Sequence, residues 1–319
     1  MNLELLHVTK RFRRLAALDD LTLAIGTGRR VALIGPNGSG KSTLTRVLMG
    51  LLAHEGQVRL DGRDPRVARL EVARRLAYVP QVAPHLGAGV GEVVRSIGEI
   101  RGVAPAVVAD LAARLGLDLG AVARKPFRAL SGGMKQKLLI ALALAPESSL
   151  LILDEPTASL DAAARQAFYE LVGERAGGAT LLLCSHRLEE VRHLVDHVVG
   201  LHAGRLAWDG PVGDYLGSRS HGVVELYLRD AAPVHEAWLR ARGFRRGAAS
   251  GWARTVAHGE KLELVRQVTV ALGERLENLV VRDLDLVEDA EGADAEGADA
   301  AAGDAPAPGP AAACREGLA

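Results

Sequence analysis

The stretch from Gly35 to Thr43, which reads Gly-Pro-Asn-Gly-Ser-Gly-Lys-Ser-Thr, constrains the fold of this chain more than any other feature. It follows the apolar run Val31–Ile34 and precedes a helix-like apolar pattern that begins at Leu44. Glycines let successive backbone N–H groups turn toward one anion, and the N-terminal end of a following helix adds partial positive charge. The stretch therefore predicts a strand, a phosphate-binding loop and a helix, with a purine nucleoside triphosphate as the ligand.

Two side chains of this loop have roles that the spacing predicts. Lys41 is placed to reach the β- and γ-phosphates, and Ser42 is placed to put its hydroxyl on the Mg²⁺ that bridges them. The alternative is a glycine-rich turn that contains lysine and serine by chance, and the complete strand, loop and helix context disfavours it. The predicted phosphate-binding residues are Gly35, Pro36, Asn37, Gly38, Ser39, Gly40, Lys41, Ser42 and Thr43.

A second predicted part of the site lies at the end of the apolar run Leu150–Leu153, where Asp154 and Glu155 follow. Continuous hydrophobicity is typical of a strand buried on both faces of a parallel sheet, and ligands gather at the carboxyl ends of such strands. We expect Asp154 to hold Mg²⁺, directly or through water, and Glu155 to polarise the water that attacks the γ-phosphate. The alternative, a strand that ends in solvated acids, is disfavoured by the phosphate-binding loop upstream.

Two rings are further candidates for nucleotide contacts. His186 follows another apolar strand, Thr180–Cys184, so we expect it at the same sheet edge, where it can hydrogen-bond the γ-phosphate or the attacking water. Phe12 precedes the phosphate-binding loop and is a candidate to stack on the nucleotide base, with core packing as the alternative.

A pair of histidines, His193 and His197, has the spacing of one helical turn. That spacing can hold a metal ion, but a third ligand is not evident in the sequence. We therefore favour a plain amphipathic helix at this position.

The segment Leu130–Met134 contains paired glycines and opens a periodic helix that continues to about Ala145. Ser131 is a candidate N-cap residue, because its hydroxyl can accept from the first-turn N–H groups. Such a helix start can also bind an anion, which would face outward on a surface helix. The alternative is a simple cap and turn.

Composition limits the classes of function. The chain of 319 residues carries 39 Lys and Arg against 39 Asp and Glu, so its net charge gives no support to nucleic-acid binding. Its two cysteines, Cys184 and Cys314, lie in different contexts and predict a reducing compartment without disulfides. We find neither a secretory signal pattern nor a long apolar run, so we expect another chain to supply any membrane span.

The order of apolar patterns predicts three parts. Alternating helices and parallel-type strands through residue 216 indicate a three-layer α/β body, with domain bounds 1–219 and a helical insert at about 82–130. Residues 220–288 predict a small βαβαβ accessory domain of the α+β class. Residues 289–319 repeat Glu-Gly-Ala-Asp-Ala and continue with Ala, Gly and Pro, so we expect a disordered tail.

Residues 1 to about 216 resemble the nucleotide-binding subunit of an ABC transporter. The motifs that carry the resemblance occur in the family's order: the phosphate-binding loop at 35–43, Gln81 of the Q-loop, the signature at 130–134, Asp154 and Glu155 of Walker B, Ser159–Asp161 of the D-loop and the switch His186. The resemblance implies a P-loop NTPase-type parallel sheet core, an antiparallel N-terminal subsheet and a helical insert.

The resemblance also implies a mechanism. Two copies close head to tail on ATP, so that Ser131, Gly132 and Gly133 of one subunit serve the ATP held by the phosphate-binding loop of the other. Hydrolysis, with Lys41, Glu155 and His186 as catalytic residues, then drives a separate integral membrane permease.

Other residues take their expected roles from the same resemblance. Gln81 contacts the γ-phosphate and Mg²⁺, Asp161 belongs to the nucleotide interface, and Phe12 stacks on adenine. The permease docks at the helical insert, which puts the chain at the cytoplasmic face of the cell membrane.

Met134 departs from the commonest form of the signature, which has glutamine at this position, and methionine cannot donate the same hydrogen bonds. Gly-Gly-Met followed by Lys-Gln-Lys resembles a branch associated with export or assembly systems. Residues 183–186 and 260–267 resemble the ATPase that supports copper-site maturation of nitrous-oxide reductase, although no copper-binding cluster is visible in the sequence.

Two other classes remain as alternatives. A non-transport ABC ATPase that acts on ribosomes or DNA would require tandem cassettes or a long coiled-coil insert, and the sequence has neither. A regulatory ATP-binding module without hydrolysis is disfavoured because both Glu155 and His186 are present.

Overall fold

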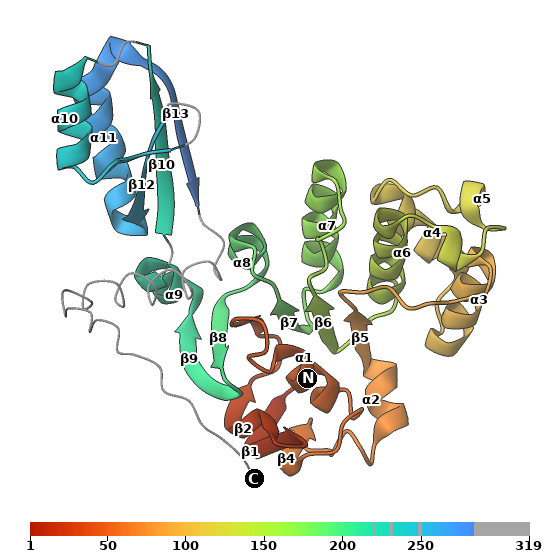
Figure 1. Ribbon diagram of the computed structural model, residues 1–319. Coiled ribbons are helices and arrows are strands. Elements are labelled where there is room, and N and C mark those ends of the chain that lie inside the picture. Colours follow the sequence, from red (N-terminus) through yellow and green to blue (C-terminus); the bar gives the residue numbers. More distant parts are fainter. Residues whose placement is uncertain (220, 230–231, 248–250, 284–319) are drawn as a thin grey trace, which may run out of the picture.

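The computed structural model describes residues 1–219, 221–229, 232–247 and 251–283. These residues form a six-stranded sheet, a three-stranded sheet and a four-stranded sheet, with helices packed on them (Figure 1). The predicted tail at 289–319, together with the last residues of the predicted accessory domain, lies outside the described residues.

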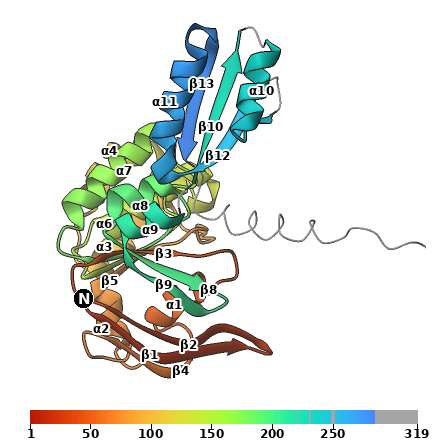
Figure 2. The ribbon, with the colours of Figure 1, turned by 90° about the vertical axis from the view of Figure 1, so that its left-hand side faces the viewer.

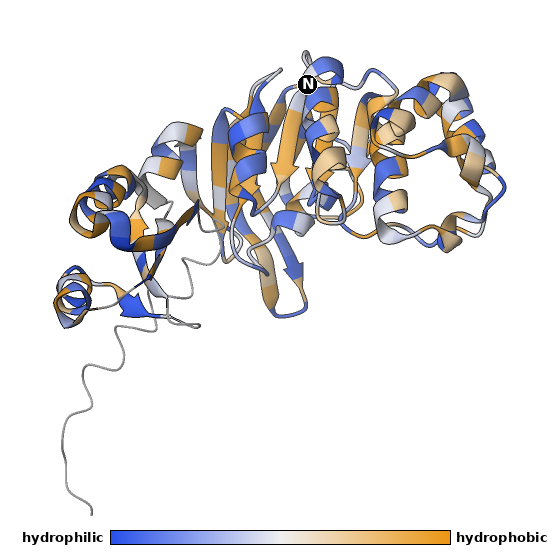
Figure 3. Ribbon diagram, turned by 90° about the horizontal axis from the view of Figure 1, so that it is seen from above, coloured by the Kyte–Doolittle hydropathy of each residue, from blue (hydrophilic) through white to orange (hydrophobic). Residues whose placement is uncertain are grey.

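The six-stranded sheet forms the centre of the α/β body. Its strands follow the order β5 (Leu76–Val79), β6 (Leu150–Asp154), β7 (Thr180–Cys184), β3 (Arg30–Ile34), β8 (His197–His202) and β9 (Arg205–Pro211). Strands β6 and β7 are buried along their whole length, as their continuous apolar runs predict. Figure 3 shows these apolar runs along the central strands and mixed hydropathy on the surrounding helices.

Five of these strands are parallel, but β9 pairs antiparallel with β8. The expectation of parallel-type strands through residue 216 is therefore wrong at β9. The reason is local: Ala203 and Gly204, the two residues between β8 and β9, have φ values of 47° and 80°. Two residues at positive φ make a tight hairpin, and parallel strands would need a much longer crossover.

The three-stranded antiparallel sheet confirms the expected N-terminal subsheet. It consists of β2 (Leu15–Ile25), β1 (Leu3–Phe12) and β4 (Glu55–Leu60), in that order. Helix α1 (Lys41–Leu48) lies between this sheet and the six-stranded sheet (Figure 2). Its buried residues Leu44, Val47 and Leu48 join one hydrophobic core with both sheets, which fixes the start of α1 relative to the strand ends.

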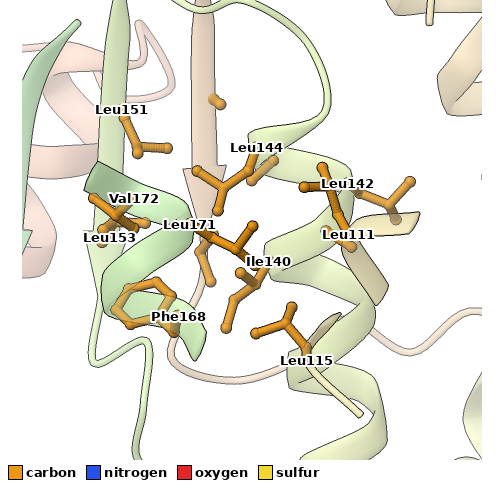
Figure 4. Packing of buried hydrophobic residues seen from close by; sticks show 14 of the residues in the cluster. Leu111, Leu115, Ile140, Leu142, Leu144, Leu151, Leu153, Phe168, Leu171 and Val172 are labelled. Atoms are coloured by element: carbon orange, nitrogen blue, oxygen red, sulfur yellow. The ribbon is translucent and has the colours of Figure 1, made fainter. Parts of the chain in front are cut away.

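Helices cover the other face of the six-stranded sheet. They are α6 (Gly132–Leu144), α7 (Ala162–Arg175), α8 (Leu188–Leu194) and the insert helices α3 (Val90–Arg101), α4 (Pro105–Arg114) and α5 (Leu119–Val122). Figure 4 shows side chains of β6, α4, α6 and α7 meeting in this core. The predicted helix start at Pro105 is confirmed, whereas the short helices α2 (Arg69–Arg75) and α5 were not predicted.

Residues 221–283, which we call the C-terminal unit, follow α9 (Val212–Arg219). Their elements are β10 (His221–Leu228), α10 (Pro233–Ala241), β11 (Arg245–Arg246), β12 (Trp252–Ala257), α11 (Lys261–Leu272) and β13 (Leu276–Asp283). The sheet order β11-β12-β10-β13 is antiparallel throughout, and the unit has its own hydrophobic core. The predicted βαβαβ pattern lacked only β11, and the observed order is that of a ferredoxin-like unit.

Candidate nucleotide-binding site

A pocket of about 520 Å³ lies at the carboxyl ends of β3, β6 and β7. Its lining residues are Phe12, Leu15, Ala17, Gly35, Asn37, Gly38, Ser39, Gly40, Lys41, Ser42, Thr43, Gln81, Asp154, Glu155, Ser185 and His186. The structure therefore brings together the phosphate-binding loop, the two acids, Gln81, His186 and Phe12.

The phosphate-binding loop exposes its backbone to this pocket. Gly38 and Gly40 have φ values of 82° and 108°, which favour glycine. A Cβ at Gly40 would lie 2.4 Å from the carbonyl oxygen of Ala17, whereas the space beside Gly38 is open. Helix α1 begins directly after Gly40 without a side-chain cap, so its first N–H groups are available to an anion.

Lys41 lies across the loop. Its Nζ donates to the carbonyl oxygen of Gly35 and to that of Pro36, the latter at 3.0 Å. Partial burial lowers the pKa of Lys41, and the carboxylates of Glu155 and Asp154 oppose this shift. A phosphate would give the ammonium group a partner of opposite charge in place of neutral carbonyls.

Ser39 is a second observation that points to a polar ligand. Its side chain is 1% exposed, and its Oγ has no hydrogen-bond partner among the described residues. A buried hydroxyl without a partner costs free energy. The residue therefore fits a pocket in which a polar ligand supplies that hydrogen bond.

Asp154 is 7% exposed and accepts a hydrogen bond of 3.4 Å from the Tyr78 hydroxyl. Burial, together with the neighbouring Glu155, raises the pKa of the Asp154 carboxyl. Burial and the Asp154 charge likewise raise the pKa of Tyr78 to about 12. A buried carboxylate of this kind is stabilised by a cation, and the oxygen donors of Ser42 and Gln81 line the same pocket. These three residues fit a Mg²⁺ site.

Glu155 and His186 form a pair across two strand ends. The His186 Nδ1 lies 2.8 Å from Glu155 Oε1, while Oε2 is buried and has no partner within the described part of the chain. The Glu155 backbone has a φ of 46°, which is uncommon for residues other than glycine and typical of functional sites. The imidazole thus orients one carboxylate oxygen and leaves the other able to accept from a water molecule.

Phe12 lies at the end of β1 and is 44% exposed, with the Lys10 ammonium 4.9 Å from its ring centroid. The alternative of core packing is therefore wrong, because a large part of the ring is accessible at the pocket wall. Leu15 and Ala17 of β2 line the pocket beside it and were missed by the sequence analysis. Strand β2 begins earlier than residue 21, where the alternating pattern becomes clear.

Ser131, Gly132, Gly133 and Asp161 do not line this pocket. The predicted N-cap is confirmed, because Ser131 Oγ accepts from the Met134 N–H at 3.3 Å. Ser131 and Gly132 are exposed, and a Cβ at Gly133 would approach the Ser159 carbonyl oxygen to 2.9 Å. Asp161 caps α7 and pairs with Lys137 at 2.9 Å. The start of α6 is thus a separate surface.

The helix expected through His193 and His197 is wrong. His193 lies in α8 and stacks on Tyr169 at 5.0 Å between ring centroids, whereas His197 begins β8 and contacts Asp209 at 2.6 Å. The apolar run after His197 belongs to a sheet strand, which overrides the helical spacing. Across the described ranges, His, Cys, Asp and Glu side chains form no group of three or more that could hold a metal ion.

Comparisons with known proteins agree with this geometry. Residues 18–158 match the ABC transporter family. The chain is 34% identical to the Nod factor export ATP-binding protein I of Cupriavidus metallidurans, over 73% of this chain and 79% of that protein. It is 33% identical to the sulfate/thiosulfate import ATP-binding protein CysA 2 of Chromobacterium violaceum, over 86% of this chain and 74% of that protein.

Solved structures give the same result. One described as the ATP binding subunit of an ABC transporter matches with a TM-score of 0.62 and 30% identity, over 67% of this chain and 91% of that chain. These matches cover most of each relative's own length. The chain therefore belongs to the ABC transporter family, as one of its ATP-binding subunits with ATPase activity coupled to transport.

Proposed function

We propose that this chain powers a separate membrane permease by binding Mg·ATP in the pocket, closing on a second copy and hydrolysing the nucleotide. One observation carries the proposal. The pocket gathers a phosphate-binding loop, a buried Asp154 and an oriented Glu155–His186 pair, while the exposed cap at Ser131 lies elsewhere on the same subunit.

The residues divide the chemistry among them. The N–H groups of the loop and the Lys41 ammonium stabilise the charge of the phosphates. Ser42, Asp154 and Gln81 would hold Mg²⁺, which neutralises charge on the phosphates when bound. Glu155 accepts the proton of the attacking water, and His186 keeps the Glu155 carboxylate in position. Phe12 stacks on the base.

The start of α6 supports a role for a second copy. Ser131, Gly132 and Gly133 present the N-terminal end of a 13-residue helix on an exposed surface, away from the pocket of their own subunit. Such an end favours an anion. In the proposed homodimer it completes the ATP site of the partner subunit, with Asp161 beside it at the start of α7.

An apolar groove on the surface supports the proposal that a separate permease docks on this chain. It has a volume of about 440 Å³ and is lined by residues of α2, β5, α3 and α6. At its rim, Leu51 and Ile100 are 67% and 73% exposed. None of the helices in the described ranges combines the length and apolar character needed to cross a bilayer. We propose that a segment of the permease occupies this groove, which places the chain at the cytoplasmic face of the membrane.

The C-terminal unit is proposed as an accessory domain, within bounds of about 220–288, that serves as a docking or regulatory surface. The names of the chain's relatives include both an export and an import system, so we assign neither a transported compound nor a direction of transport. The likeness to the branch that supports copper-site maturation stays a prediction.

The test is ATP turnover by the purified protein. Glu155→Gln keeps the shape of the side chain but removes the base, so we expect the rate to fall about a hundredfold to ten-thousandfold. Glu170→Gln, the same change at an exposed position of α7, is the matched control and should keep the wild-type rate. An unchanged rate for Glu155→Gln would contradict the assigned role.

A further inference from the structure

A fully buried glutamate lies behind the Glu155–His186 pair. Glu190 is in α8, and its side chain is 0% exposed. Buried carboxylates are rare unless they are paired, because loss of water disfavours the charge. Burial is also the largest cause of the raised pKa of Glu190.

The Glu190 carboxyl contacts the two loops that carry the pair. The Thr157 hydroxyl donates to Glu190 Oε1, and the Ser185 side chain, close to the same carboxyl, partly offsets the rise in its pKa. Thr157 lies two residues after Glu155, and Ser185 lies directly before His186. Glu190 therefore joins the loop after β6 to the loop after β7.

A backbone hydrogen bond also links the two strand ends close to the pair. The Glu155 backbone N–H donates to the Cys184 carbonyl oxygen at 2.8 Å. That bond fixes the backbone where the strands end, whereas Glu190 contacts side chains of the two loops. The contact of 2.8 Å from His186 Nδ1 to Glu155 Oε1 joins the same two segments of the chain.

The polar atoms around Glu190 are not arranged to make the fold as stable as possible. Its Oε2 and the nearby Arg187 Nε are buried and lack hydrogen-bond partners in the part of the chain that the structure describes. Arg187 Nε lies 4.0 Å from Glu190 Oε1, which is beyond hydrogen-bond distance. An apolar side chain of similar volume in place of a buried ion is often as stable or more stable. The carboxyl is therefore better explained by what it positions.

We propose that Glu190 is a positioning residue for ATP hydrolysis, which holds the loops after β6 and β7 so that Glu155 and His186 meet in the productive geometry. This proposal rests on the proposed function. Glu190 does not line the nucleotide pocket, so it acts through Thr157 and Ser185 and not on the nucleotide.

The first experiment measures kcat and KM for ATP in Glu190→Ala and Glu190→Gln. Misplacing a catalytic group by about 1 Å costs about a hundredfold in rate, so we expect Glu190→Ala to lose about tenfold to a hundredfold in kcat with KM unchanged. Glu190→Gln keeps a group that can bond both hydroxyls and should restore most of kcat. The neighbouring Glu189→Gln, whose side chain is 71% exposed, is the matched control and should match the wild type.

Thr157→Val keeps the test decisive if Glu190→Ala fails to fold. It removes one hydroxyl and leaves the volume nearly constant, and we expect it to lower kcat without a change in KM. In the double variant with Glu190→Ala the losses should not add, because both changes break the same link. If kcat and KM both change across these variants in proportion to the loss in melting temperature, the proposal is overturned.

The outcome is separate from that of the proposed function. If Glu155→Gln abolishes turnover while Glu190→Ala keeps the wild-type kcat, the positioning role is wrong and the ATPase assignment stands. If Glu155→Gln has no effect, the assigned catalytic pair is wrong, and the role proposed for Glu190 is wrong with it.

Discussion

The nucleotide pocket and the C-terminal unit differ in whether their buried polar side chains have hydrogen-bond partners. In the pocket, Ser39 Oγ and Glu155 Oε2 are buried without partners. Within residues 222–229, 232–247, 251–257 and 259–282, by contrast, no buried side-chain nitrogen or oxygen atom lacks a partner. Charged groups of the C-terminal unit pair at the surface, as Glu225 does with Arg282 at 2.7 Å.

This difference distinguishes a region that binds a ligand from one in which the protein satisfies its own polar groups. Unpaired buried polar groups cost stability, so each one calls for an explanation. In the pocket, a ligand can supply the missing hydrogen bonds to Ser39 and Glu155, and the described part of the C-terminal unit has no such groups. The unit has a hydrophobic core of its own, which fits the proposal of a docking or regulatory surface.

The largest expected effect tests whether the two regions are independent. Trp252 is 2% exposed in the core of the C-terminal unit, so Trp252→Ala should lower the free energy of unfolding of that unit by about 3–5 kcal/mol. ATP turnover should be unchanged, because the pocket shares no core residue with the unit.

Denaturant unfolding and ATPase rates measure the two effects. Leu262→Ala is the control, since Leu262 is 84% exposed on α11 and should change stability by less than about 0.5 kcal/mol. If turnover fell in parallel with the stability of the unit, the two regions would be coupled.

A smaller effect compares one substitution at an unpaired and at a paired serine. Ser39→Ala removes a buried hydroxyl without a partner and should raise the free energy of unfolding by about 1 kcal/mol, while it weakens ATP binding. Ser131→Ala removes a cap hydrogen bond and should lower it by about 1 kcal/mol. Thermal unfolding without nucleotide measures the change in stability of each variant. Changes of the same sign in the two variants would contradict the interpretation of the pocket.

The smallest effect is a difference in pH dependence. Burial raises the pKa of Asp154 above its ordinary 3.8, so the folded chain is destabilised as pH rises above that value. Asp154→Asn should therefore increase stability at pH 7, and the increase should disappear below pH 3.8.

Glu263 in the C-terminal unit should behave in the opposite sense. Its hydrogen bonds with Arg266 and Gln267 lower its pKa from 4.5 to about 2, so its contribution is present above pH 4.5 and is lost as pH falls toward 2. Glu263→Gln should decrease stability at pH 7, and the decrease should disappear below pH 2. Unfolding curves at several pH values compare the two variants, and slopes of the same sign would break the contrast.

Much of the pocket could be predicted because its residues belong to local patterns. The loop at 35–43, the acids after β6 and His186 after β7 each follow a continuous apolar strand, and parallel strands bring their carboxyl ends to one edge. Ser131 was predictable as a cap for a similar reason, since capping depends on a few neighbouring residues.

The remaining features depend on contacts between distant residues. The direction of β9 follows from a two-residue hairpin, and α2 and β11 are too short to have a period of their own. Phe12 is exposed where β1 ends, two residues before β2 begins. Glu190 carried no signal in the sequence, because its importance comes from Thr157 and Ser185, which are distant in the chain.

The most direct test of the proposed mechanism is the mass of Glu155→Gln in solution with Mg·ATP, measured by light scattering. We expect the 33.7 kDa chain to double in mass with one ATP bound per copy, and Ser131→Arg to remain monomeric while it still binds ATP. A monomer of Glu155→Gln with ATP bound, or a dimer that Ser131→Arg does not disturb, would contradict a nucleotide site shared between two copies.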